Sequence, residues 1–187
     1  MINLATTLAV ITIALGGMVL SASHSSSPKP ENKGHDIASL TVTSPAFAPS
    51  TMIPEKYSCQ GTNINPPIHI DGIPPETKSM VLIVNDPDAP VAGGFKHWVM
   101  WNIDQTMPDI PEGYHGAVQG FNSFKKKGYN GPCPPQGTHH YHFMVYCLNS
   151  LINIPTDSYG DKVERAIKGR IIAQGELIGL YSKTKSK

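Results

Sequence analysis

The segment 130–144, NGPCPPQGTHHYHFM, carries three histidines, a tyrosine and a cysteine among three prolines. Imidazole, phenol and thiol groups are the side chains that hold metal ions, surround an anion with hydrogen-bond donors, or form a nucleophile with its base. The same composition also fits a loop that runs into a buried strand. This segment is therefore the first candidate for a functional site, and its chemistry depends on which side chains share a face.

The strand period separates the histidines into two groups. Residues two apart lie on one face of a strand, so we expect His139 and Tyr141 to point the same way. His140 and His142 would then point the other way, with the spacing of a metal-binding pair. No carboxylate occurs in 143–150 to complete such a site, so we expect no bound metal. His139 and Tyr141, which follow a turn stiffened by prolines, are therefore the pair expected to have a functional role.

Two more carboxylates lie in DPDAP, residues 86–90, directly after the apolar run MVLIVN. Asp86 and Asp88 would stand at the end of a strand, where side chains face a crevice instead of a core. They fit a general acid and base pair, a calcium loop, or a proline-stiffened turn capped by an aspartate. Calcium is disfavoured because prolines replace oxygen donors and no acidic ligand follows.

Short apolar segments between turn signals must position these groups, and they predict a β-rich fold, all-β or α+β. The expected strands are 39–44, 66–72, 79–86, 95–103, 141–148 and 169–182. The runs MVLIV and HFMVY are continuously apolar, which predicts central strands covered on both faces. One helix is expected at 158–167, with Asp157 or Ser158 as its cap. The segment 104–138 has no sustained period, and loops of that length are usually functional.

The overall composition fits one exported domain. The chain has 187 residues with 15 basic and 14 acidic side chains, so it lacks the broad charge that would hold nucleic acid. Residues 1–23 contain an apolar run without charged side chains and predict a secretory signal peptide, hence a periplasmic or secreted protein. The alternative is an uncleaved segment that tethers the protein to a membrane. Residues 24–36 read as a flexible linker, and 37–187 as the folded domain.

The three cysteines fit an oxidising compartment. Cys59 and Cys133 lie in loops rich in glycine and proline, whereas Cys147 lies in the apolar run FMVYCL. We therefore expect a disulfide between Cys59 and Cys133, with Cys147 buried and free.

Three motifs in order carry a resemblance to a known family. DPDAP at 86–90, HW at 97–98 and GPCPPxGxHxY at 131–141 resemble the phosphatidylethanolamine-binding protein family, also called the Raf kinase inhibitor protein family. The chain looks like its bacterial and archaeal branch, and the resemblance extends from SPAF at 44–47 to the final strands. It implies a PEBP-like fold, mainly β, with a large central antiparallel sheet, a smaller second sheet and one or two short helices.

The resemblance also implies a site. Family members bind anions such as phosphate or acetate, and the phosphoryl head groups of lipids, in a small pocket near the surface. The matching ligand positions are Asp86, His97, His139 and Tyr141, the wall positions are Pro132, Cys133, Ala89 and Pro90, and Asp88 is a further candidate. Most members have HRY where this chain has HHY, so an arginine is replaced by His140.

The expected function is that of a non-catalytic binding protein and regulatory module without a cofactor, whose ligand is a small anion or a phosphorylated compound such as a phosphoethanolamine head group. The sequence has no Gly-x-Ser-x-Gly elbow, and a dyad of Cys133 and His139 competes with the expected disulfide. The alternative that the resemblance implies is a secreted inhibitor of a serine protease, or of a kinase-type partner. The oligomeric state is left open, a homodimer included.

Overall fold

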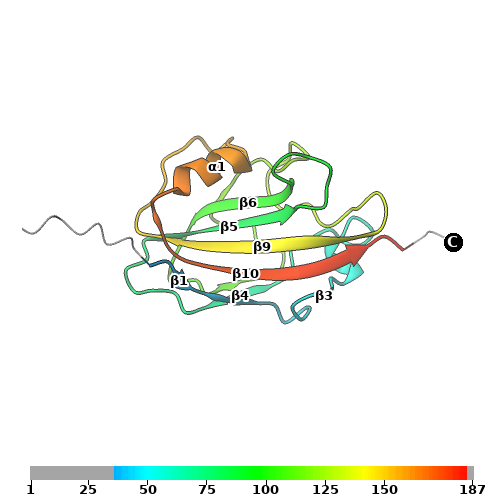
Figure 1. Cartoon of the computed structure of the whole chain (residues 1–187), viewed down its shortest axis with the longest axis horizontal. Helices are drawn as coiled ribbons and strands as arrows, with labels where there is room; N and C mark the ends of the chain where they lie inside the picture. The colour runs from blue at the N-terminus through cyan, green and yellow to red at the C-terminus, as the bar shows by residue number, and fades with distance from the viewer. Residues whose placement is uncertain (1–35, 185–187) are drawn as a thin grey trace, which may run out of the picture. The chain divides into compact units, whose positions relative to one another are not determined.

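Strands make up most of the regular structure (Figure 1). The computed structural model describes residues 36–184, so the expected signal peptide and residues 24–35 of the expected linker lie outside the described residues. The elements are β1 (Ala38–Ser39), β2 (Thr41–Thr43), β3 (Thr51–Met52), the 3-10 helix η1 (Glu55–Tyr57), β4 (Ile68–Asp71), β5 (Ser79–Asp86), β6 (Phe95–Ile103), β7 (Asp109–Ile110), β8 (Val118–Gln119), β9 (Thr138–Leu148), α1 (Gly160–Ile167) and β10 (Ile171–Ser182).

The larger sheet has seven strands in the order β1-β10-β9-β5-β6-β8, with β3 also paired to β10. The four long strands β10, β9, β5 and β6 pair antiparallel, as expected. The sheet as a whole is mixed, because β1 and β3 both pair parallel with β10. These two strands are only two residues each, and they cover separate parts of one edge.

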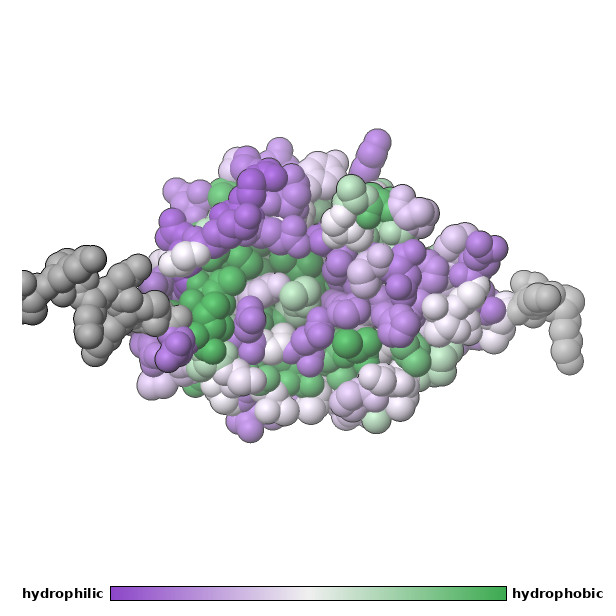
Figure 2. All heavy atoms as spheres, in the orientation of Figure 1, coloured by the Kyte–Doolittle hydropathy of each residue, from purple (hydrophilic) through white to green (hydrophobic). Residues whose placement is uncertain are grey.

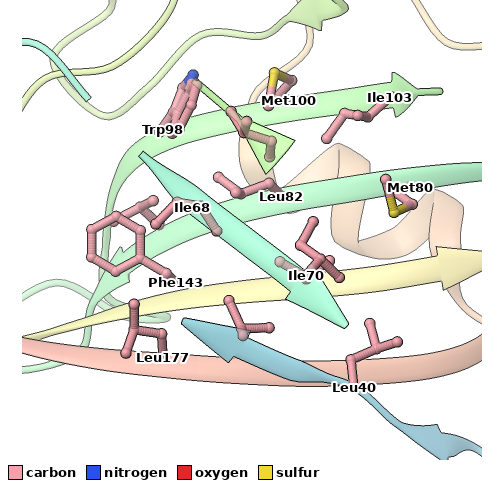
Figure 3. Packing of buried hydrophobic residues seen from close by; sticks show 14 of the residues in the cluster. Leu40, Ile68, Ile70, Met80, Leu82, Trp98, Met100, Ile103, Phe143 and Leu177 are labelled. Atoms are coloured by element: carbon pink, nitrogen blue, oxygen red, sulfur yellow. The ribbon is translucent and has the colours of Figure 1, made fainter. Parts of the chain in front are cut away.

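A smaller antiparallel sheet, β2-β4-β7, covers one face of the larger sheet. Its strand β4 alternates, with Ile68 and Ile70 buried and His69 and Asp71 exposed. Figure 3 shows the side chains of Ile68 and Ile70 lying among those of the long strands, such as Leu82 and Phe143. The main core therefore fills the space between the two sheets. A second cluster, formed by β5, β6 and α1, fills the opposite face.

Among the long strands, β9 begins three residues before the expected 141, and β10 begins two residues after the expected 169. The bounds of β5 and β6 match the expected ranges 79–86 and 95–103. The expected strand 39–44 is split into β1 and β2, and the short β3, β7 and β8 were missed. Strand β5 is buried on both faces as expected, whereas β9 alternates between buried residues and half-buried or exposed ones. The prediction for HFMVY was therefore wrong for the outer face of β9.

Helix α1 lies within the expected range 158–167, but its predicted cap is wrong. The N-cap residue is Tyr159, which makes no side-chain capping bond. The hydroxyl of Ser158 instead donates to the carbonyl oxygen of Pro155, at 2.6 Å. None of the helices in the described part of the chain has the length and apolar character needed to cross a membrane.

A disulfide joins Cys59 to Cys133, and Cys147 is a buried free thiol, as predicted. The disulfide ties the loop after η1 to the segment that precedes β9. The proline-rich segment 131–137 is therefore held on both sides, by the disulfide and by β9.

Figure 2 shows hydrophilic residues over most of the visible face of the domain, with apolar residues exposed in patches between them.

Candidate functional site

A cavity of about 290 Å³ lies where β5 ends, β6 begins and β9 begins. We call it the histidine cavity. Six of the residues predicted from the motifs line it: Asp86, Ala89, Pro90, His97, Cys133 and His139. Because β5 pairs antiparallel with both neighbours, the last residues of β5 lie beside the first residues of β6 and β9. The sheet topology therefore brings together three motifs that are separated along the chain.

The centre of the site is a buried pair. The Nδ1–H of His139 donates to Oδ2 of Asp86 at 2.8 Å, and both side chains are about nine-tenths buried or more. The other carboxylate oxygen, Oδ1, accepts the backbone N–H groups of Asp88 and Ala89 at 3.0 and 3.1 Å. Asp86 is thus held by three donors, which is how proteins accommodate a buried carboxylate. The arrangement fixes the ring of His139 and leaves its Nε2 for the cavity.

The second imidazole, that of His97, is also held at Nδ1, in this case by a backbone carbonyl group. Nδ1–H of His97 donates to the carbonyl oxygen of Asn130 at 2.6 Å. The side chain of Asn130 is bonded in turn by the buried amide of Asn122, at 3.0 Å. Burial lowers the pKa of His97, although the Asn130 carbonyl and the charge of Asp86 act in the opposite direction. His97 is therefore neutral near pH 7, with Nε2 as an acceptor.

Tyr141 is not among the side chains that line the cavity, but it contacts one of them, His97. It is fully buried and packs edge-on against the ring of His97, with centroids 5.2 Å apart. Burial and the nearby charge of Asp86 raise the pKa of Tyr141, so its hydroxyl keeps its proton. Within residues 36–184 this hydroxyl meets no hydrogen-bond partner of good geometry, although the carboxylate of Asp86 and the backbone of Cys133 lie near it. A buried hydroxyl without a partner is costly, which makes Tyr141 a candidate donor to a ligand.

One wall is a rigid backbone segment. Cys133, Pro134 and Pro135 line the cavity, and the disulfide ties Cys133 to Cys59. The N–H of Cys59 also donates to the carbonyl oxygen of Pro132, at 3.1 Å. A Cβ atom at Gly131 would collide with the backbone of Tyr57 and Ser58, so the two backbones are in direct contact. The wall is therefore fixed by covalent, hydrogen-bonded and packing contacts.

The mouth of the cavity is apolar and partly exposed. Phe95 and Phe124 stack edge-to-face with centroids 4.7 Å apart, and both rings contact His97. Val91 and Phe124 are 51% and 39% exposed. An apolar rim around two imidazoles excludes water and strengthens the polar contacts inside. Such a mixture of apolar walls and few polar groups is typical of small-molecule sites.

Two further predicted residues, Pro132 and Asp88, do not line the cavity. Pro132 contributes its carbonyl oxygen to the wall contact with Cys59 and does not line the cavity. Asp88 is exposed, and its Oδ2 accepts both the backbone N–H and the Nδ1–H of His140, at 2.8 and 2.7 Å. This side-chain bond lowers the pKa of Asp88. Asp88 therefore holds the turn against β9 and does not face the cavity directly.

The alternation expected for β9 is confirmed. His139 and Tyr141 are buried on one face, while His140 is exposed and His142 is half-buried on the other. His142 bonds to Glu176 of β10, at 2.6 Å. His140 and His142 are thus each paired with a carboxylate of another segment, and they do not converge on one point.

Five lining residues were missed: Val91, Phe95, Phe124, Pro134 and Pro135. Phe95 had a signal, because it lies two residues before His97 on the same strand. Pro134 and Pro135 belong to the GPCPP motif, next to a residue that was selected. No pattern in the sequence pointed to Phe124, because it lies in the aperiodic segment 104–138 and reaches the mouth of the cavity only through the folded loop.

The chemistry open to this site is the binding of a polar group by two fixed imidazoles. Cys133 is in a disulfide and offers no thiolate nucleophile. Within residues 36–184 no three His, Cys, Asp or Glu side chains are grouped closely enough to hold a metal ion. The polar side chains that line the cavity are the imidazoles of His97 and His139 and the carboxylate of Asp86, groups that donate and accept hydrogen bonds.

Comparisons of the sequence and of the structure with known proteins all point to one family. The model of the phosphatidylethanolamine-binding protein family matches residues 43–182. A UPF0098 protein of Pyrococcus horikoshii is 45% identical over 161 residues, which cover 80% of each chain. A PEBP homolog of Chlamydia trachomatis has a similar structure, with a TM-score of 0.74, 39% identity, and coverage of 78% of this chain and 99% of the other. The structure of E. coli YbcL gives a TM-score of 0.73 at 32% identity and the same coverage.

Proposed function

The chain belongs to the phosphatidylethanolamine-binding protein family, and from that premise and the geometry of the histidine cavity we propose that it binds a small oxyanion, a phosphate or phosphate ester, without transforming it. The observation that carries the proposal is the fixing of both imidazoles at Nδ1. His97 is tied to the Asn130 carbonyl and His139 to Asp86, so both Nε2 atoms are left to the same cavity.

The two histidines would play different roles. His139 lies against a buried carboxylate, and in its imidazolium form it would donate Nε2–H to a phosphoryl oxygen. His97 is kept neutral by burial, so its Nε2 would accept the proton of a monoprotonated phosphate. Phosphate monoesters lose their second proton near pH 6, so both protonation states of the ligand exist near neutrality. The site is therefore suited to an anion that still carries one proton.

The side chains at the mouth favour binding over catalysis. Val91, Phe95 and Phe124 shield the two rings, and a shielded anion gains more from each hydrogen bond than one in water. A hydrolase would need an activated nucleophile beside the ligand, and Cys133 is occupied by its disulfide. These groups support a regulatory role in which the occupancy of the cavity changes with the ligand concentration and the pH.

The test is calorimetric titration of the purified protein with inorganic phosphate between about pH 5 and 8. We expect the affinity to change with pH, because the phosphate ligand gains or loses a proton in that range. His139→Asn retains an N–H donor for Asp86 but removes Nε2, and we expect it to weaken binding by about tenfold or more. Affinity that is flat with pH and unchanged in this variant would refute the proposal.

His142→Asn is the matched control. His142 lies on the same strand, three residues further, and also bonds a carboxylate through Nδ1, but it faces away from the cavity. We expect its affinity for phosphate to equal that of the unmodified protein. Inhibition of a protease or kinase stays a prediction from the family resemblance, and none of the described side chains singles it out.

A further inference from the structure

A second cavity, of about 270 Å³, adjoins the histidine cavity. We call it the tyrosine cavity, after Tyr159. Its lining includes Val91, Phe121, Ser123, Tyr159, Asp161 and Glu164. The motifs that identify the family contribute nothing to it, since DPDAP, HW and GPCPP lie elsewhere in the chain. The chemistry of the tyrosine cavity is therefore set by residues outside these motifs.

The two cavities are bounded by the same two segments. Phe95 and Phe124 line the histidine cavity, whereas their neighbours Lys96 and Ser123 line the tyrosine cavity. Val91 lines both, and it is 51% exposed. The cavities therefore come within the width of one valine side chain of each other. A ligand anchored in the first is able to extend over Val91 into the second.

An aromatic surface forms one side of the tyrosine cavity. The rings of Phe121 and Tyr159 stack with centroids 5.3 Å apart and an interplanar angle of 27°. The ammonium group of Lys127 lies 5.7 Å from the ring centroid of Phe121. Tyr159 is 44% exposed, so it offers a flat apolar surface to a ligand. The C–H face of a sugar ring packs well on such a surface.

The charges around the tyrosine cavity argue against a second anion. The ammonium of Lys96 is nearly buried, and its three donors are used by Asn85, Gly93 and Glu164, at 3.1, 2.7 and 2.9 Å. Asp161 and Glu164 keep further carboxylate oxygens at the cavity. Carboxylates accept hydrogen bonds from hydroxyl groups and repel phosphate. The group expected here is therefore neutral or cationic.

Hydrogen-bond donors lie at the same cavity, which favours a neutral group. The hydroxyl oxygen of Ser123 accepts the N–H of Lys96 at 2.9 Å, and its proton is left to donate. Gly160 and Asp161 are the first residues of α1, so their N–H groups have no partner within the helix. A sugar hydroxyl both donates and accepts, and it matches a surface that offers donors and acceptors side by side.

We propose that the ligand is a phosphorylated sugar, with its phosphoryl group in the histidine cavity and its ring packed on Tyr159 in the tyrosine cavity. The ring crosses Val91, and its hydroxyls bond to Ser123 and to the carboxylates of Asp161 and Glu164. This inference rests on the proposed function, because the phosphoryl group is the anchor. The tyrosine cavity then determines which phosphate ester is preferred.

The test compares three probes by calorimetry on the purified protein: inorganic phosphate, O-phosphoethanolamine and glucose 6-phosphate. We expect glucose 6-phosphate to bind about tenfold more tightly than inorganic phosphate, since ring packing adds to the anchor. In Tyr159→Ala the ratio of the two affinities should fall towards one. In Tyr159→Phe it should be largely retained, because the ring surface remains. Tyr146→Ala, a tyrosine on the outer face of β9, is the matched control and should keep the ratio.

The outcomes separate this inference from the proposed function. If phosphate binds and glucose 6-phosphate binds no more tightly, the sugar inference is wrong and anion binding stands. If O-phosphoethanolamine binds more tightly than glucose 6-phosphate, or if the sugar preference survives in Tyr159→Ala, the tyrosine cavity does not recognise a sugar. If no probe binds, the proposed function fails and the inference fails with it.

Discussion

His139 and Asp86 form a buried pair in which Nδ1–H donates to Oδ2 over 2.8 Å, between residues that are 53 positions apart in the chain. The pair joins the start of β9 to the end of β5. The same carboxylate holds two backbone N–H groups of its own turn. Asp86 therefore has two tasks, to shape the turn DPDAP and to orient the imidazole. Its contacts explain why a carboxylate lies beside a site proposed for an anion.

The first prediction concerns this carboxylate. Asp86→Asn replaces one acceptor oxygen by an amide that cannot accept, so a buried donor loses its partner. We expect the free energy of unfolding to fall by about 1–3 kcal/mol and the affinity for phosphate to fall by about tenfold. Urea unfolding and calorimetry measure the two effects.

The control for Asp86 is another histidine–aspartate pair. His69 and Asp109 lie 2.7 Å apart, but their side chains are 49% and 75% exposed. We expect Asp109→Asn to change the free energy of unfolding by less than about 1 kcal/mol, because exposed pairs contribute little. Equal effects of the two substitutions would show that burial of the Asp86 pair has no special role.

The second prediction concerns pH and His97. Burial lowers the pKa of His97 from its ordinary value of 6.5, so the folded chain binds fewer protons than the unfolded chain below that pH. The free energy of unfolding should therefore fall as the pH falls from 6.5 towards the lowered pKa. Above pH 6.5, His97 should cause no such loss of stability. His97→Asn retains a donor for Asn130 and should flatten that part of the curve.

The measurement is urea unfolding of both proteins at about pH 5 and pH 8. The difference in stability between the two pH values should be smaller in His97→Asn than in the unmodified protein. His115→Asn, at an exposed histidine, is the control and should retain the full difference. A pH dependence that is identical in all three proteins would contradict the assignment of this effect to His97.

The third prediction concerns the hydroxyl of Tyr141, which is buried without a partner. Tyr141→Phe removes a desolvated polar group and preserves the ring that packs on His97. We expect the free energy of unfolding to rise by about 1 kcal/mol while the affinity for phosphate falls. If stability rises and the affinity is unchanged, Tyr141 does not contact the ligand.

The fourth prediction concerns the disulfide. Cys59 and Cys133 are 74 positions apart, so their bond restricts a long loop of the unfolded chain. We expect Cys59→Ser combined with Cys133→Ser to lower the free energy of unfolding by about 4 kcal/mol. Thiol labelling of the unreduced, unfolded protein should find one reactive group, Cys147. Three reactive groups would show that the disulfide does not form.

Several features could be predicted from the sequence because they are local. The bounds of β5 and β6 were predicted because each is a mainly apolar segment between turn signals, which has few alternatives to a buried strand. The two-residue period assigned His139 and His140 to opposite faces of β9. The loop positions of Cys59 and Cys133 indicated the disulfide. The motif spacing identified the family and the polar residues of the histidine cavity.

Other features depended on tertiary structure, because they join segments that no local pattern connects. The parallel pairing of β1 and β3 with β10 depends on where the chain returns to the sheet edge. Phe124 reaches the mouth of the histidine cavity only because Asn122 organises its loop. The tyrosine cavity combines residues from the turn at Val91, the loop at Ser123 and the start of α1. Sequence periodicity reports which face of an element is buried, whereas a cavity is a property of surfaces brought together by the fold.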